Sequence, residues 1–304
     1  MKNVPSFPVG HVNHIEMHSL DFEEFCWANG MNKEGLDYIK ELFEKKEQVP
    51  VSVHNKMTDL FREYIMVGGM PKVVDEYVKN HNFVEVLKLQ RGIIQDYADD
   101  IGKYAEGTEK VKARDCFYSI PKQLAKDYKK FQYSIVEKGS TSRKYGGSLR
   151  WLYDAGIINF CYNLSSPQLP LEGNSKNDDF KIYMRDTGLL MAMLEDGSQA
   201  DIIKGNLGIY KGAIYENIIA DIFTKLNKKL YYYGIPNVIE IDFFIRREEV
   251  AVGVEVKAAD NTKSKSLKNL IGHYGVKKGI KLSSKNIGMY ENIESYPLYM
   301  AMFL

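Results

Sequence analysis

The chain has 304 residues, of which 44% are hydrophobic and 27% are charged, and its formal net charge is +1. This composition is typical of a globular protein with buried cores, and any attraction to nucleic acid must come from local patches. The three cysteines lie far apart in the sequence, which argues against a disulfide framework or a zinc site. The sequence shows no secretion signal and no apolar run long enough to cross a bilayer, so we expect a cytoplasmic protein without membrane contact.

The first hundred residues have a mostly helical pattern. Residues 12–20 predict a short strand, in which we expect His18 to lie at the surface. Asp21 is placed to cap the helix that follows. Helical spacing continues beyond it and breaks at Gly68-Gly69. We therefore expect a small helical domain over residues 1–105.

The segment from 106 to 204 changes character. Helices are followed by two strands with a long loop between them, which is the outline of a winged helix. Residues 110–150 carry eleven Lys or Arg residues against three acidic residues. We expect the last helix of this segment to present Arg143, Lys144 and Arg150 to DNA or RNA. The alternative is that the winged helix binds a protein partner and that these cations are simply solvated.

The last hundred residues predict a helix, three strands, a helix and a strand. In the second and third strands, charged residues interrupt two apolar rows, one of which runs over residues 239–245. Because strand side chains alternate between faces, Asp242 is expected opposite Gly253 or Glu255. The same alternation predicts that Asp242, Glu255 and Lys257 share one face of the sheet.

The helix that precedes these strands offers a fourth charged residue. Glu216 lies in an apolar stripe of that helix, and a buried carboxylate is usually paired or bound to a metal. Glu216, Asp242 and Glu255 are therefore candidate ligands for Mg²⁺, which prefers carboxylate oxygens. Together with Asp242 and Glu255, Lys257 is a candidate catalytic residue that would position the attacking water. The alternative is an ordinary ion pair of Lys257 with Asp242 or Glu255.

The order of these residues, quoted as YEN, EIDF and VEVKA, resembles the PD-(D/E)XK nuclease-like superfamily. The wider chain, with YIMVGGMPKVV, QDYADDIGKYA and RWLYDAGII, resembles a group of bacterial and archaeal predicted AAA-type ATPases. In that group a nucleotide-binding domain is followed by a winged helix and a nuclease-like domain of unknown function. The resemblance implies an α/β multidomain fold with a lid-like ATPase remnant over 1–105, a winged helix over 106–204 and a nuclease-like domain over 205–304.

The chain departs from this group because it contains no G-x-x-x-x-G-K-[ST] phosphate loop. Members of the group carry their ATP site upstream, so we expect no ATP binding or hydrolysis here. The leading hypothesis is a Mg²⁺-dependent nuclease or a nucleic-acid-binding protein, with Lys263 and Lys265 at a phosphate-binding rim. The alternative for these lysines is a solvated amphipathic helix, and the alternative for the chain is a non-catalytic protein-interaction or regulatory module.

Overall fold

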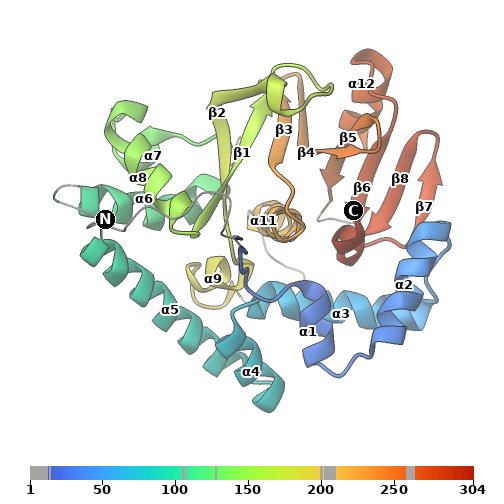
Figure 1. Cartoon of the computed structure of the whole chain (residues 1–304), viewed down its shortest axis with the longest axis horizontal. Coiled ribbons are helices and arrows are strands. Elements are labelled where there is room, and N and C mark those ends of the chain that lie inside the picture. The colour runs from blue at the N-terminus through green and yellow to red at the C-terminus, as the bar shows by residue number, and fades with distance from the viewer. Residues whose placement is uncertain are drawn as a thin grey trace.

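A computed structural model gives the fold of the chain, which combines helices with one mixed sheet (Figure 1). The prediction of an α/β chain is confirmed. No helix in the part of the chain that is described is long and apolar enough to cross a membrane. The structure describes residues 13, 15–104, 107, 109–126, 129–198, 201, 210–257 and 264–304.

The N-terminal part is helical, as the sequence predicts. Its helices are α1 (Phe22–Ala28), α2 (Lys33–Lys45), α3 (Val51–Val67), α4 (Pro71–Asn80) and α5 (Phe83–Tyr104). Asp21 caps α1 through a reciprocal pair of hydrogen bonds with Glu24, which satisfies two otherwise unpaired backbone N–H groups. The predicted strand is wrong, because residues 15–20 form no strand. This segment instead lies against the helices, where Leu20 pairs with Gly69 through a backbone hydrogen bond of 2.8 Å.

The middle of the chain holds helices followed by a two-stranded ribbon. The elements are α6 (Glu109–Leu124), α7 (Tyr133–Val136), α8 (Ser142–Asp154), β1 (Ile158–Leu164), η1 (Glu172–Asn174), β2 (Ser175–Met184) and α9 (Thr187–Ala192). β1 and β2 pair antiparallel, so the two predicted strands are confirmed.

The C-terminal part has the predicted order of helix, three strands, helix and strand, followed by a short hairpin. The elements are α11 (Tyr210–Lys225), β3 (Leu230–Ile235), β4 (Ile239–Arg247), β5 (Val250–Val256), α12 (Lys265–His273), β6 (Gly279–Ser283), β7 (Gly288–Tyr290), β8 (Ile293–Pro297) and η2 (Leu298–Phe303). Figure 1 shows α11 near the centre of the molecule, between the ribbon of β1 and β2 and the C-terminal strands.

All of these strands belong to one sheet with the order β2-β1-β3-β4-β5-β6-β8-β7. The ribbon joins the C-terminal strands because β1 runs parallel to β3, with Cys161 opposite Leu230. The sheet is therefore continuous across the boundary predicted at residue 204. The separate winged-helix and nuclease-like domains remain predictions.

An irregularity in β4 changes which residues share a face. Tyr231 lies opposite Phe244, whereas Tyr233 lies opposite Ile241, so β4 has one more residue than β3 between these pairs. Such a bulge reverses the alternation of side chains. Ile241 accordingly packs with Phe244, while Phe243 packs in the other hydrophobic cluster. The predicted single apolar row over residues 239–245 is therefore wrong, because the bulge places its residues on both faces of the sheet. A bulge inside a strand leaves no clear signal in the sequence.

The loop between α3 and α4, which contains Gly68 and Gly69, contacts the segment between β2 and α9. Gly68 has a positive φ of 73°, and a side chain at Gly69 would meet the Leu20 carbonyl oxygen at 2.0 Å. The Gly69 N–H donates a hydrogen bond of 2.8 Å to the buried Asp186 carboxylate, which also caps α9. The predicted break at Gly68-Gly69 is therefore a turn that encloses a carboxylate.

Candidate functional site: the buried charge network

Glu216 lies on α11 with 5% of its surface exposed, so the sequence placed it correctly in a buried position. Both of its carboxylate oxygens have partners. Lys129 forms an ion pair with Oε1, and the Tyr183 hydroxyl donates a hydrogen bond of 3.0 Å to Oε2. Burial on its own raises the pKa of Glu216, but Lys129 and Lys181 outweigh it and hold the pKa below its ordinary value.

Lys181 is the second cation of this network and is almost completely buried on β2. Its Nζ lies 2.6 Å from Glu240 Oε1 and 3.8 Å from Glu216 Oε2. The same ammonium group lies 4.7 Å from the centre of the Tyr232 ring, a favourable arrangement of a cation and an aromatic face. Burial lowers the pKa of Lys181, but the two glutamates more than offset it, so the lysine stays charged.

Asp242 belongs electrostatically to the same network. Burial, followed by the charge of Glu216, raises the pKa of Asp242 to about 7. Its Oδ2 also accepts a hydrogen bond of 2.7 Å from the Val256 backbone N–H. We use the term charge network for Lys129, Lys181, Tyr183, Glu216, Glu240 and Asp242.

Glu255 and Lys257 form a separate pair. Lys257 Nζ lies 2.7 Å from Glu255 Oε1, which is one of the ion pairs considered from the sequence. Side chains alternate along β5, so Glu255 shares the face of Gly253, whose added Cβ would meet Leu270 of α12 at 2.7 Å. The other Glu255 oxygen, Oε2, is buried without a hydrogen-bond partner among the described residues.

The four candidate residues are thus divided between two faces of the sheet. Glu216 and Asp242 interact on the α11 face, whereas Glu255 and Lys257 pair on the α12 face. No group of three or more His, Cys, Asp or Glu side chains within the described ranges is arranged to hold a metal ion. The Mg²⁺ site and the catalytic roles of these residues remain predictions.

The predicted nucleic-acid contacts fall on the surface of α8 and α12. Lys144 pairs with Glu137 at 2.5 Å, and Arg150 pairs with Asp154 at 3.2 Å, whereas Arg143 is exposed. Lys265 begins α12, and Lys263 lies outside the described residues. Acidic partners thus share the charge of two of the three predicted α8 contacts.

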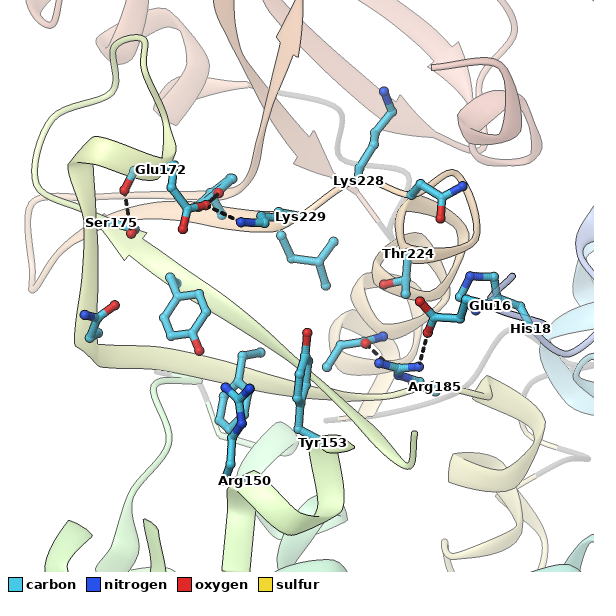
Figure 2. Close-up of a pocket in the computed structure, with 17 residues that line it drawn as sticks. Glu16, His18, Arg150, Tyr153, Glu172, Ser175, Arg185, Thr224, Lys228 and Lys229 are labelled. Carbon is cyan, nitrogen blue, oxygen red and sulfur yellow. Dashed lines mark hydrogen bonds and ion pairs between the residues drawn. The ribbon is translucent and has the colours of Figure 1, made fainter. Parts of the chain in front are cut away.

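A polar cavity, whose lining residues Figure 2 shows, lies next to α8 and was missed by sequence reasoning. Its volume is 370 Å³. Arg185, Asn159 and His18 line it together with Arg150, so Arg150 faces a hollow as well as solvent. His18 was expected at the surface, but its Nε2 atom is buried without a partner among the described residues. No sequence signal joins these residues, because they come from four separate segments.

Two family models match the chain. Residues 58–200 match a domain of unknown function (DUF8612), and residues 211–302 match a second domain of unknown function (DUF4143). The second model is typical of the C-terminal regions of AAA-type ATPases, so residues 211–302 are similar to such a region. No curated protein and no solved structure matches the chain.

Proposed function

We propose that the C-terminal part of this chain is a nuclease-like module that does not cut nucleic acid and serves as a regulatory or interaction module of an AAA-ATPase-like protein. The observation that carries this proposal is the enclosure of Glu216. Both carboxylate oxygens of Glu216 already have partners, which are Lys129, Lys181 and Tyr183. Neither oxygen is therefore free to bind a metal ion.

The charge balance of the network supports the same conclusion. The buried Lys181 and the partly buried Lys129 lie beside Glu216, and a divalent cation brought to the same carboxylate would be repelled by both ammonium groups. Asp242 already accepts a hydrogen bond of 2.7 Å from the Val256 backbone N–H through Oδ2, so one of its two oxygens is engaged. The Mg²⁺ ion therefore does not fit these residues in the arrangement that they adopt, and we derive no reaction step through it.

Contacts between the helices and the strands support a regulatory role. Lys225 of α11 donates hydrogen bonds to the Tyr64 hydroxyl at 2.8 Å and to the Leu20 carbonyl at 3.0 Å. At the other end of the sheet, Lys46 pairs with the buried Glu294 at 2.6 Å. These polar contacts join the N-terminal helices to α11 and to β8, which is the physical connection that a regulatory role requires.

A cleavage assay tests the proposal. The full chain is incubated with single- and double-stranded DNA and RNA in the presence of Mg²⁺ or Mn²⁺, beside a Glu255→Ala, Lys257→Ala double variant. We expect no cleavage that distinguishes the two proteins and no heat of metal binding in calorimetry. Cleavage by the wild type that the double variant loses would overturn the proposal and establish the metal-dependent nuclease.

A Glu216→Gln variant gives a second readout. If Glu216 serves as the counter-charge of Lys129 and Lys181, the variant leaves two buried cations poorly balanced and lowers the free energy of unfolding by about 3 kcal/mol. A metal ligand in the protein without metal would show the opposite, because removing a repelled carboxylate stabilises the fold. A stabilised Glu216→Gln variant therefore contradicts the proposal.

A further inference from the structure

The polar cavity in Figure 2 has the chemistry of an anion site. It lies between the N-terminal segment, α8, β1, β2, the end of α11 and β3. Its volume of 370 Å³ falls within the range of about 300–1,000 Å³ that small-molecule sites occupy. It shares no lining residue with the charge network, so conclusions about one do not depend on the other.

A buried amide defines the polar end of the cavity. Asn159 is 4% exposed, and its Oδ1 accepts a hydrogen bond of 2.9 Å from Arg185 Nε. Arginine can only donate hydrogen bonds, so the atom facing it must be the oxygen, and this fixes the orientation of the amide. The Asn159 Nδ2 group is then a buried donor, and it has no partner among the described residues. A buried donor without an acceptor is costly, and a ligand oxygen would satisfy it.

Two guanidinium groups flank the same end of the cavity. The ring of Tyr153 lies between them, with its centre 5.0 Å from Arg150 and 5.5 Å from Arg185. Figure 2 shows the Tyr153 side chain rising between the two arginines. Stacking on an aromatic ring fixes the plane of a guanidinium group and leaves its N–H groups directed sideways. Arg185 donates hydrogen bonds through Nε and Nη1, and Nη2 has no acceptor in the described parts of the chain.

The carboxylates near these arginines are weak competitors for a ligand. Arg185 pairs with Glu16 at 2.8 Å and Arg150 pairs with Asp154 at 3.2 Å. The side chains of both acids are 59% exposed, so solvent screens these pairs and each is worth little. Either carboxylate can turn into water when a stronger anion enters.

We propose that this cavity binds the phosphate group of a small phosphate monoester, through Asn159 Nδ2 and the guanidinium groups of Arg150 and Arg185. Donors from three side chains suit the three terminal oxygens of a phosphate monoester better than the two oxygens of a carboxylate. The remaining wall combines aromatic and aliphatic side chains, such as Tyr162 and Leu230, with polar ones such as Lys229, and it accommodates the organic part of the ligand.

Calorimetric titration of the full chain tests this proposal with adenosine 5′-monophosphate, glucose 6-phosphate and inorganic phosphate as probes. Adenosine and acetate serve as the phosphate-free and carboxylate controls. We expect the phosphate-bearing probes to bind at millimolar concentration or better, and the two controls to bind at least about tenfold more weakly. Absence of binding by all three phosphate probes, or equal binding of acetate, overturns the proposal.

Two variants assign the site. Asn159→Asp replaces the free donor by a carboxylate, which repels the phosphate while keeping an acceptor for Arg185, and should weaken binding by at least about tenfold. Arg150→Met removes a side chain that is 63% exposed, so the fold survives, and it should weaken binding severalfold. Lys144→Met, on the same helix but outside the cavity, should leave the affinity unchanged. Unchanged affinity in both Asn159→Asp and Arg150→Met overturns the assignment.

Discussion

The two faces of the C-terminal strands are covered by different helices, α11 and α12, and the contacts with these helices differ in kind. On the α11 face, the charge network buries Lys181 and Glu216 beside the apolar core and pairs them with the partly exposed Glu240 and Lys129. On the α12 face, Gly253 and Gly279 have no side chains, so Leu270 and Leu267 of α12 approach the backbone closely. The α11 face therefore contains a set of ion pairs, whereas the α12 face contains close apolar contacts. The comparison shows that charged residues on neighbouring strands need not form one site. Asp242 of β4 and Glu255 of β5 point to opposite faces of the sheet and have different partners.

Loss of a cation from the charge network should have the largest effect. Lys181→Met keeps the volume of the side chain but leaves Glu216 and Glu240 without their shared counter-charge. We expect the free energy of unfolding to fall by about 3 kcal/mol, because Glu240 loses its ion-pair partner and Glu216 loses one of its two neighbouring cations. Denaturant unfolding followed by circular dichroism measures this change.

The matched control for this prediction is Lys144→Met, which breaks an ion pair between side chains that are 45% and 48% exposed. We expect it to change the free energy of unfolding by less than about 1 kcal/mol. Equal losses in Lys181→Met and Lys144→Met would show that the charge network is no stronger than a surface pair.

The apolar face is tested by adding one methyl group. In Gly253→Ala the new Cβ would meet a Leu270 methyl group at 2.7 Å, so α12 or its leucine must move. We expect a loss of about 1–3 kcal/mol in the free energy of unfolding from overpacking. Gly272→Ala, inside α12 and with open space around it, is the control and should stabilise the protein by about 0.5–1 kcal/mol. If both variants stabilise the protein, the close approach of α12 to β5 is wrong.

The pH dependence of stability should change the free energy of unfolding only gradually with each pH unit, and it tests whether Asp242 titrates near neutral pH. Its pKa is raised from 3.8 to about 7 by burial and by Glu216, so the folded chain binds this proton more tightly than the unfolded chain. Stability is therefore greatest below pH 4 for this group and declines as pH rises toward 7. The slope from one group is at most about 1.4 kcal/mol per pH unit.

Asp242→Asn separates this contribution from that of Asp221, whose pKa is also raised to about 7 by burial. The asparagine mimics the protonated acid and keeps an oxygen for the Val256 N–H. Unfolding midpoints measured from pH 4 to 8 should decline less steeply in the variant than in the wild type. Parallel curves would mean that Asp242 does not titrate in this range.

Local chemistry made much of the fold predictable. The Asp21 cap and the break at Gly68-Gly69 are short-range features, and the structure contains both. The order of elements over α11 to β6 followed from hydrophobic periodicity in the same way. The strand expected over residues 12–20 failed: within its described part the Leu20 N–H pairs with the Gly69 carbonyl of a helix-connecting loop rather than with a sheet.

The candidate site depended on contacts that periodicity does not encode. The sequence indicated correctly that Glu216 is buried and that Lys257 pairs with a carboxylate. It did not indicate that Lys129, distant in the sequence from α11, would be the partner of Glu216. Nor did it show the bulge in β4, which follows from the pairing with β3 rather than from the residues of β4 alone.

The sequence by itself determined most of the helices and strands and the buried position of Glu216, because propensity, capping and periodicity act over a few neighbouring residues. Only the tertiary structure decided which charges meet. Strand register, one bulge and the path of the segment before α7 bring Lys129 and Lys181 to Glu216 and leave Glu255 with Lys257. Electrostatic energy depends on the distance between the charges and on their burial in the folded protein, and the spacing of residues along the chain predicts neither quantity.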